Sequence, residues 1–177
     1  MTSPQPVQHT IALRMPDWCS QPSVMLNGEA CQGEIRKGYL HITRIWQEGD
    51  RIAMTLAMPV RRVYGNPLLR HVAGKVAVQR GPLVYCLEEA DNGEALHNLW
   101  LPKDSTFNLI EGKGIFAHKV LIQADGLCMA SKQAEQQALY HYDKSPVTAE
   151  PKKLTFIPWF SWANRGEGEM RIWVNGE

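Results

Sequence analysis

The sequence lacks both a dominant charge and a long apolar run. Its 19 lysine and arginine residues nearly balance 18 aspartate and glutamate residues, which leaves a formal net charge of +1. So small a charge creates no field that would steer the chain toward nucleic acid or an anionic membrane, and neither partner is predicted. No apolar stretch approaches the roughly 20 residues of a membrane-spanning helix. The polar start, MTSPQPVQHT, also lacks the apolar core of a signal peptide, so we expect a soluble, cytoplasmic chain.

The sequence also lacks spacings that would build a metal or nucleophile site. Its four cysteines form no C-x-x-C pair, and its histidines never occur as H-x-H or H-x-x-x-H. The G-x-S-x-G motif of serine hydrolases does not occur either. We therefore expect reduced thiols and no zinc in this chain. Cys86 lies in an apolar run, so it is expected to be buried and unreactive.

The acidic residues do not form an evident catalytic pair. Hydrolysis of a glycosidic bond generally requires two carboxyl groups, or a nucleophile and an acid, across a sugar-sized cleft. Glu88 and Glu89 are adjacent at the end of an expected strand, so their side chains point to opposite faces. Glu167 and Glu169 share a face, but they lie in a glycine-rich turn where solvated charges are the simpler interpretation. No catalytic, cofactor-binding or metal-binding residue is assigned, and the chain alone is predicted to be inactive.

Alternating apolar residues predict strands along most of the chain. The strands are expected at residues 11–15, 24–26, 30–31, 39–46, 52–58, 72–78, 83–87, 96–101 and 116–122, with a loop at 131–139. The Asn27-Gly28 pair indicates a tight hairpin, because both residues tolerate positive φ. The pattern is typical of an all-β chain with two β-sandwich or jelly-roll-like domains. The polar DNGE segment at 91–94 predicts a boundary that gives domains 1–92 and 93–177.

Two segments carry the strongest patterns. The sequence GKVAVQRGPLVYCLEE, Gly74 to Glu89, predicts two strands, and the apolar residues on both faces of the second strand predict that Val84 is buried. The sequence LTFIPWFSWANRGEGEMRIWV, Leu154 to Val174, predicts a closing hairpin with a glycine-rich turn. An offset of three would place Trp159 and Trp162 on opposite faces of its first strand. If one indole is in the core, the other then faces outward.

These two segments, together with IALRMPDW (Ile11 to Trp18) and MPVRRVYGNP (Met58 to Pro67), closely resemble the C-terminal region of glycoside hydrolase family 127, the β-L-arabinofuranosidase group. The resemblance implies that this chain is the non-catalytic β-sandwich part of a larger glycosidase. It implies that catalysis, by a cysteine nucleophile beside a cysteine-ligated zinc, belongs to an upstream helical barrel. The expected partner is that N-terminal barrel of the same protein.

The aromatic residues admit two interpretations. Tryptophans are most often core or interface residues, but an exposed indole can also stack on a sugar ring. The residues expected to dock the barrel or to contact sugar are Trp159, Trp162, Tyr64, Asn66 and Pro67. The alternative function is a carbohydrate-binding module that acts on its own. An apolar patch left uncovered would also favour self-association.

Overall fold

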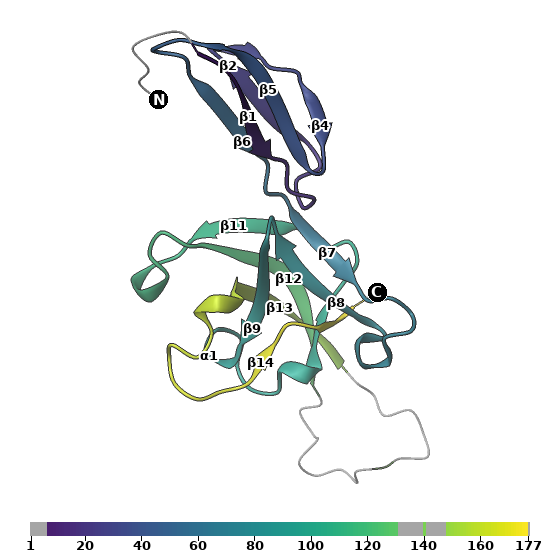
Figure 1. Ribbon diagram of the computed structural model, residues 1–177. Coiled ribbons are helices and arrows are strands. Elements are labelled where there is room, and N and C mark those ends of the chain that lie inside the picture. The colour runs from purple at the N-terminus through teal and green to yellow at the C-terminus, as the bar shows by residue number, and fades with distance from the viewer. Residues whose placement is uncertain (1–6, 131–139, 141–147, 177) are drawn as a thin grey trace. The chain divides into compact units, whose positions relative to one another are not determined.

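The computed structural model describes residues 7–130, 140 and 148–176, and the chain divides into two compact units, Met1–Pro59 and Val60–Glu177 (Figure 1). Strands dominate both units, which confirms the all-β class. The expected loop at residues 131–139 lies outside the described residues. Within the described ranges, no helix has the length and apolarity that crossing a bilayer requires.

Unit 1 is a small antiparallel sandwich. One sheet has the order β1-β5-β4 and the other β3-β2-β6. Their side chains meet in a core formed by Met15, Val24, Leu40, Ile42 and Trp46. The strands are β1 (Val7–Arg14), β2 (Pro22–Leu26), β3 (Glu29–Ala30), β4 (Glu34–Arg36), β5 (Tyr39–Trp46) and β6 (Ile52–Leu56).

The turn between β2 and β3 has the predicted chemistry. Asn27 and Gly28 have φ angles of 54° and 87°, the positive values that a two-residue hairpin turn requires. The Asn27 side chain also donates to Asp50 Oδ1 over 2.7 Å and accepts from the Arg51 backbone N–H over 2.8 Å. The turn is therefore connected to the neighbouring β5–β6 turn by side-chain hydrogen bonds.

Unit 2 is one curled sheet of nine strands. The strands β9, β13, β12, β10, β15 and β8 pair in that order, and β8 pairs again with β9, which closes a ring. Strand β7 extends the ring beside β8, β11 lies beside β12, and β14 beside β9. The elements are β7 (Val60–Tyr64), η1 (Arg70–Val72), β8 (Lys75–Arg80), β9 (Leu83–Glu88), α1 (Glu89–Asn92), η2 (Leu96–Asn98), β10 (Leu99–Leu101), β11 (Phe107–Glu111), η3 (Gly114–Phe116), β12 (Val120–Ala130), β13 (Thr148–Pro158), η5 (Trp159–Ser161), β14 (Met170–Arg171) and β15 (Val174–Gly176).

The ring encloses the main core of unit 2. Tyr85 and Leu87 of β9 are fully buried in it, while Cys86 faces a second cluster with Phe116 and Ile157, as strand alternation predicts. The other members of the main core are Val76, Val78, Leu96, Leu99, Leu101, Ile122, Ala124, Leu154, Phe156 and Val174.

The domain boundary lies between Pro59 and Val60, not at residue 92 as the sequence predicted. The reason is the pairing of the Gly74–Glu89 segment. Strand β8 pairs with β15, and β9 pairs with β13 and β14, all of which come from the end of the chain. The two strongest strands of the expected first domain therefore belong to the second unit.

The closing hairpin is also a wrong prediction. Strand β13 pairs with β9 through Phe156 and Leu87, and β14 pairs with the opposite edge of β9 through Arg171 and Leu87. Strand β9 therefore lies between the two segments that were expected to pair. Alternation identifies a strand and its faces, but it does not identify the neighbouring strand.

Val84 is exposed, with 38% of its surface accessible, although it was predicted to be buried. The second cluster covers β9 only at Cys86, where Phe116, Leu121 and Ile157 pack against it. The start of β9 on that face has no such cover.

Candidate functional site

Three exposed aromatic side chains, Trp159, Phe160 and Trp162, form the aromatic patch of unit 2. Their exposed fractions are 49%, 59% and 42%. The strand β13 ends at Pro158, and Trp159 begins the 3-10 turn η5, which the Trp162 N–H closes by donating to the Trp159 carbonyl over 3.0 Å. Because a 3-10 turn has three residues per turn, positions three apart lie on the same side. The expectation that the two indoles face opposite ways is therefore wrong, because it assumed a strand.

An ion-pair cluster around the buried Glu88 carboxylate fixes the loop that follows the aromatic patch. The Arg165 guanidinium donates from Nε to Glu88 Oε2 over 3.0 Å and from Nη1 to Asp91 Oδ1 over 2.7 Å, and its Nη2 contacts both carboxylates. It also lies 4.7 Å from the centre of the Phe116 ring. Hydrogen bonds to Asp91 and Glu88 hold the pKa of Arg165 above its usual range. The guanidinium is therefore charged at any working pH.

Glu88 is the buried partner, since its side chain is only 5% exposed. Its second oxygen, Oε1, accepts from the Ala163 backbone N–H over 3.2 Å. One carboxylate thus binds both the side chain and the backbone of the loop that begins at the aromatic patch. The sequence analysis missed this cluster, because Arg165 and Glu88 are 77 residues apart and neither stands in a recognisable motif.

Two further carboxylates hold backbone rather than face a cleft. Glu89 Oε2 accepts from the Glu169 N–H over 2.7 Å, and Glu169 Oε2 accepts from the Leu96 N–H over 2.8 Å. These hydrogen bonds attach the segment before β14 to α1 and η2. Such carboxylates are occupied by structural contacts and are not arranged as an acid and a base across a sugar-sized cleft.

The turn at residues 64–67 carries the other predicted contact residues. Tyr64 is 55% exposed, and Asn66 is exposed on the turn after β7, where its Oδ1 accepts from the Leu68 N–H over 3.0 Å. Pro67 follows it in the same exposed turn, and Leu68 and Leu69, which the sequence analysis did not single out, are also exposed, at 87% and 56%.

The two groups of predicted residues do not converge. Figure 1 shows the turn after β7 and the loop after β13 on opposite sides of unit 2. They are therefore two surfaces and not one site.

The cysteine and histidine residues that the structure describes do not come together as a zinc site. Among the described residues, no group of three metal-binding side chains comes together. All four cysteines are free thiols. Burial, together with the nearby charges of Glu88 and Asp91, raises the pKa of Cys86 to about 12, so this thiol is protonated at neutral pH and is a poor ligand and nucleophile.

These features define an all-β chain whose polar clusters serve its own structure. Residues 60–175 match the model of the glycoside hydrolase family 127 C-terminal domain, and residues 1–58 match that of the β-L-arabinofuranosidase, GH127 middle domain. The chain belongs to glycoside hydrolase family 127. The two matches also divide the chain where the structure does.

Relatives of known identity agree with this assignment. The chain is 34% identical over 173 residues to a non-reducing end β-L-arabinofuranosidase of Bifidobacterium longum subsp. longum, covering 90% of this chain and 25% of that protein. It matches the crystal structure of a family 127 β-L-arabinofuranosidase from Geobacillus stearothermophilus T6 with a TM-score of 0.87 and 39% identity, covering 98% of this chain and 27% of the other. A structure of another family 127 β-arabinofuranosidase matches with a TM-score of 0.85 and 28% identity, covering 98% and 28%. The chain therefore spans about a quarter of the length of these relatives.

Proposed function

We propose that this chain is the non-catalytic C-terminal part of a longer glycoside hydrolase that acts on β-L-arabinofuranosides, and that it supports a helical-barrel catalytic domain. The observation that carries the proposal is that the two units match the middle and C-terminal domains of one family, while the chain covers only a quarter of a relative's length. In this proposal the reacting groups, including any zinc with its cysteine ligands, belong to the catalytic domain.

The aromatic patch is the surface that would contact the barrel. Three large apolar side chains on one short segment are costly to leave in water, since a fully buried aromatic side chain contributes about 1.5–3 kcal/mol relative to an exposed one. The Arg165 cluster holds the following loop in place before any partner binds, which lowers the entropic cost of association. An exposed apolar patch of this kind typically marks an interaction site.

The test is to express the parent protein from its complete reading frame, with Trp159→Ser and Phe160→Ser combined. We expect faster loss of arabinofuranosidase activity on heating and faster proteolysis between the domains. Leu109→Ser is the matched control, since Leu109 is 52% exposed on β11 and lies outside the patch. In the 177-residue chain alone, all of these variants should melt like the unchanged chain, because the altered residues are exposed. Equal effects of patch and control variants in the parent protein would contradict the docking role.

Two measurements on the 177-residue chain complete the test. It should not hydrolyse an aryl β-L-arabinofuranoside, and detectable turnover would overturn the non-catalytic assignment. It should also form dimers or larger species at high concentration, because the patch is uncovered. The patch variant should remain monomeric. If the unchanged chain is strictly monomeric, the aromatic patch does not act as an apolar docking surface.

A carbohydrate-binding module is the second candidate function, and the exposure of both Trp159 and Trp162 on one turn favours it. Two indoles on one side of a turn offer flat apolar faces on which sugar rings can stack. Titration with arabinose-containing oligosaccharides, followed by tryptophan fluorescence, separates the two functions. Saturable binding that Trp159→Ser abolishes would favour the module, and no response would favour the supporting role.

A further inference from the structure

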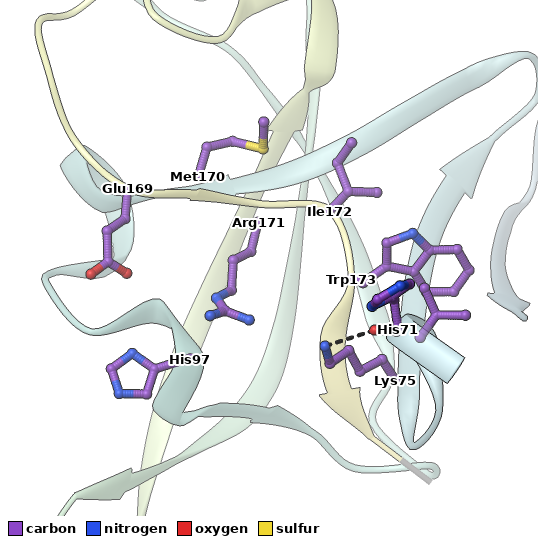
Figure 2. A pocket seen from close by; sticks show the side chains of 9 residues that line it. His71, Lys75, His97, Glu169, Met170, Arg171, Ile172 and Trp173 are labelled. Carbon is purple, nitrogen blue, oxygen red and sulfur yellow. Dashed lines mark hydrogen bonds between the residues drawn. The ribbon is translucent and has the colours of Figure 1, made fainter. Parts of the chain in front are cut away.

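A groove with an excess of cationic groups lies on unit 2, and neither the aromatic patch nor the Arg165 cluster contributes to its lining. It has a volume of about 570 Å³, within the range of small-molecule sites. Its walls come from η1, the start of β8, η2 and the segment from Glu169 to Trp173 (Figure 2). The polar and aromatic lining residues are His71, Lys75, His97, Glu169, Arg171 and Trp173.

The segment that forms one wall alternates its side chains. Met170 and Ile172 pack against the second apolar cluster of unit 2. Figure 2 shows Glu169 and Arg171 extending from the opposite side of this segment, with His97 below them. The partly buried Met170 and Ile172 thus fix the direction of the Arg171 side chain. A guanidinium on such a wall is oriented by the strand and not by a hydrogen bond of its own.

Arg171 is a half-buried cation that its surroundings do not neutralise. Within the described part of the chain, its guanidinium has no hydrogen-bond or ion-pair partner. Glu169 is the one acidic residue of the lining, and its Oε2 already accepts the Leu96 N–H over 2.8 Å. Lys75 adds a second cation, whose Nζ donates one hydrogen bond to the His71 carbonyl over 3.0 Å and retains two further N–H groups.

We propose that this groove binds a saccharide that carries a carboxylate, such as a uronic acid, with the carboxylate on Arg171 and Lys75. A guanidinium presents paired N–H donors that match the two oxygens of a carboxylate, and Lys75 supplies a point charge from the other wall. The Trp173 indole, which lines the groove beside His71 (Figure 2), offers an apolar surface to a sugar ring. The carboxylate follows from Arg171, whereas the saccharide follows from membership of a glycosidase family.

This ligand site goes beyond the proposed supporting role and does not depend on it. The test uses the 177-residue chain labelled with ¹⁵N and titrated with galacturonate, while two-dimensional spectra are recorded. We expect the indole N–H signal of Trp173 to move and that of Trp46, which is buried in the core of unit 1, to stay in place. Galactose is the neutral control for the sugar, and acetate is the control for the carboxylate alone.

Variants identify the group that binds the carboxylate. Arg171→Gln should weaken binding about tenfold or more, because charge-assisted hydrogen bonds are lost. Arg171→Lys keeps the charge without the paired donors, so its affinity should lie between those of the unchanged chain and Arg171→Gln. Arg70→Gln makes the same change in charge on exposed η1 outside the lining and should bind like the unchanged chain. Because the Arg171 side chain has no hydrogen-bond or ion-pair partner among the described residues, Arg171→Gln should also melt like the unchanged chain, so lost binding would not reflect unfolding.

Each alternative outcome contradicts the proposal. Equal binding of galactose would show that the carboxylate is not recognised. Equal binding of acetate would show a plain anion site without sugar recognition. Unchanged binding by Arg171→Gln, or no shift of the Trp173 signal at millimolar galacturonate, would remove the site altogether.

Discussion

Replacement of Arg165 by methionine should destabilise unit 2 through the charge that it leaves behind. Methionine retains much of the apolar stem of Arg165 but removes the guanidinium that lies over the Phe116 ring, and with it every hydrogen bond to Glu88 and Asp91. Glu88 would then be a carboxylate with a 5% exposed side chain and a single remaining hydrogen bond, from the Ala163 N–H. A buried charge without its partner is far less stable than the pair.

The magnitude follows from the depth of the site. Removing one partner of a buried ion pair typically costs about 3–5 kcal/mol. We expect the lower end, about 3 kcal/mol, because the loop above Glu88 can lift and admit water, which limits the penalty. For a unit of this size, such a loss lowers the melting temperature by about 10 °C. Glu88→Gln combined with Arg165→Met should recover part of the loss, because no unpaired carboxylate then remains at position 88.

Thermal unfolding of the single and double variants measures this coupling, and limited proteolysis reports on the loop from 162 to 169. Arg70→Met is the matched control, since Arg70 is exposed on η1 and outside the cluster. It should melt like the unchanged chain. If Arg165→Met melts within about 2 °C of the unchanged chain, or if adding Glu88→Gln recovers no stability, the ion-pair cluster does not hold the loop.

Three further predictions concern the two cores and the turns of unit 1. Val84→Asp should lower the free energy of unfolding by less than about 1 kcal/mol, because Val84 is 38% exposed. Val78 is fully buried in the main core, so Val78→Asp should prevent soluble folding. Expression and thermal melting of both variants check this. Cys86 should resist alkylation at pH 8 until denaturant is added, as mass spectrometry would show, and rapid labelling of the native chain would contradict its burial. Because folding raises the pKa of this thiol from 9.0 to about 12, its contribution to the free energy of unfolding should fall as the pH rises through that range. Hydrogen bonds from Asn27 and the Gln47 N–H lower the pKa of Asp50 below its ordinary 3.8. The ionised Asp50 carboxylate therefore stabilises unit 1 above that pH, and this contribution is lost in acid as the carboxylate is protonated. Asp50→Asn should reduce this acid dependence in a pH series of melting curves.

Local patterns in the sequence predicted individual strands and turns better than they predicted which strands pair with each other. The strand at residues 39–46, the Asn27-Gly28 turn and the alternation of Tyr85, Cys86 and Leu87 are all confirmed, since each depends on neighbouring residues alone. The domain boundary and the closing hairpin are wrong, because both depend on which distant strand occupies the edge of β9. Polar DNGE is a helical turn and loop within unit 2, and polarity alone does not distinguish such a loop from a linker.

The candidate surfaces were predicted only in part, because the sequence shows local patterns and not contacts between distant residues. An outward tryptophan was expected in the closing segment, and both indoles are outward because the chain turns into η5 after Pro158. The Arg165 cluster and the Arg171 groove were not predicted. Each brings together residues that are far apart in the sequence, so no local motif indicates either site.

The position of the Glu88–Arg165 ion pair explains how unit 2 can present an aromatic surface without a strand to support it. After Pro158 the chain leaves the sheet, so the ladder hydrogen bonds that would fix a strand are lost. Glu88, at the end of β9, whose last four residues are buried, replaces them with hydrogen bonds to the Arg165 side chain and the Ala163 N–H. The rigidity of the core is thereby transmitted to an exposed loop through polar contacts. A loop held in this way loses little freedom when another domain covers it, and this is the property that a docking surface requires.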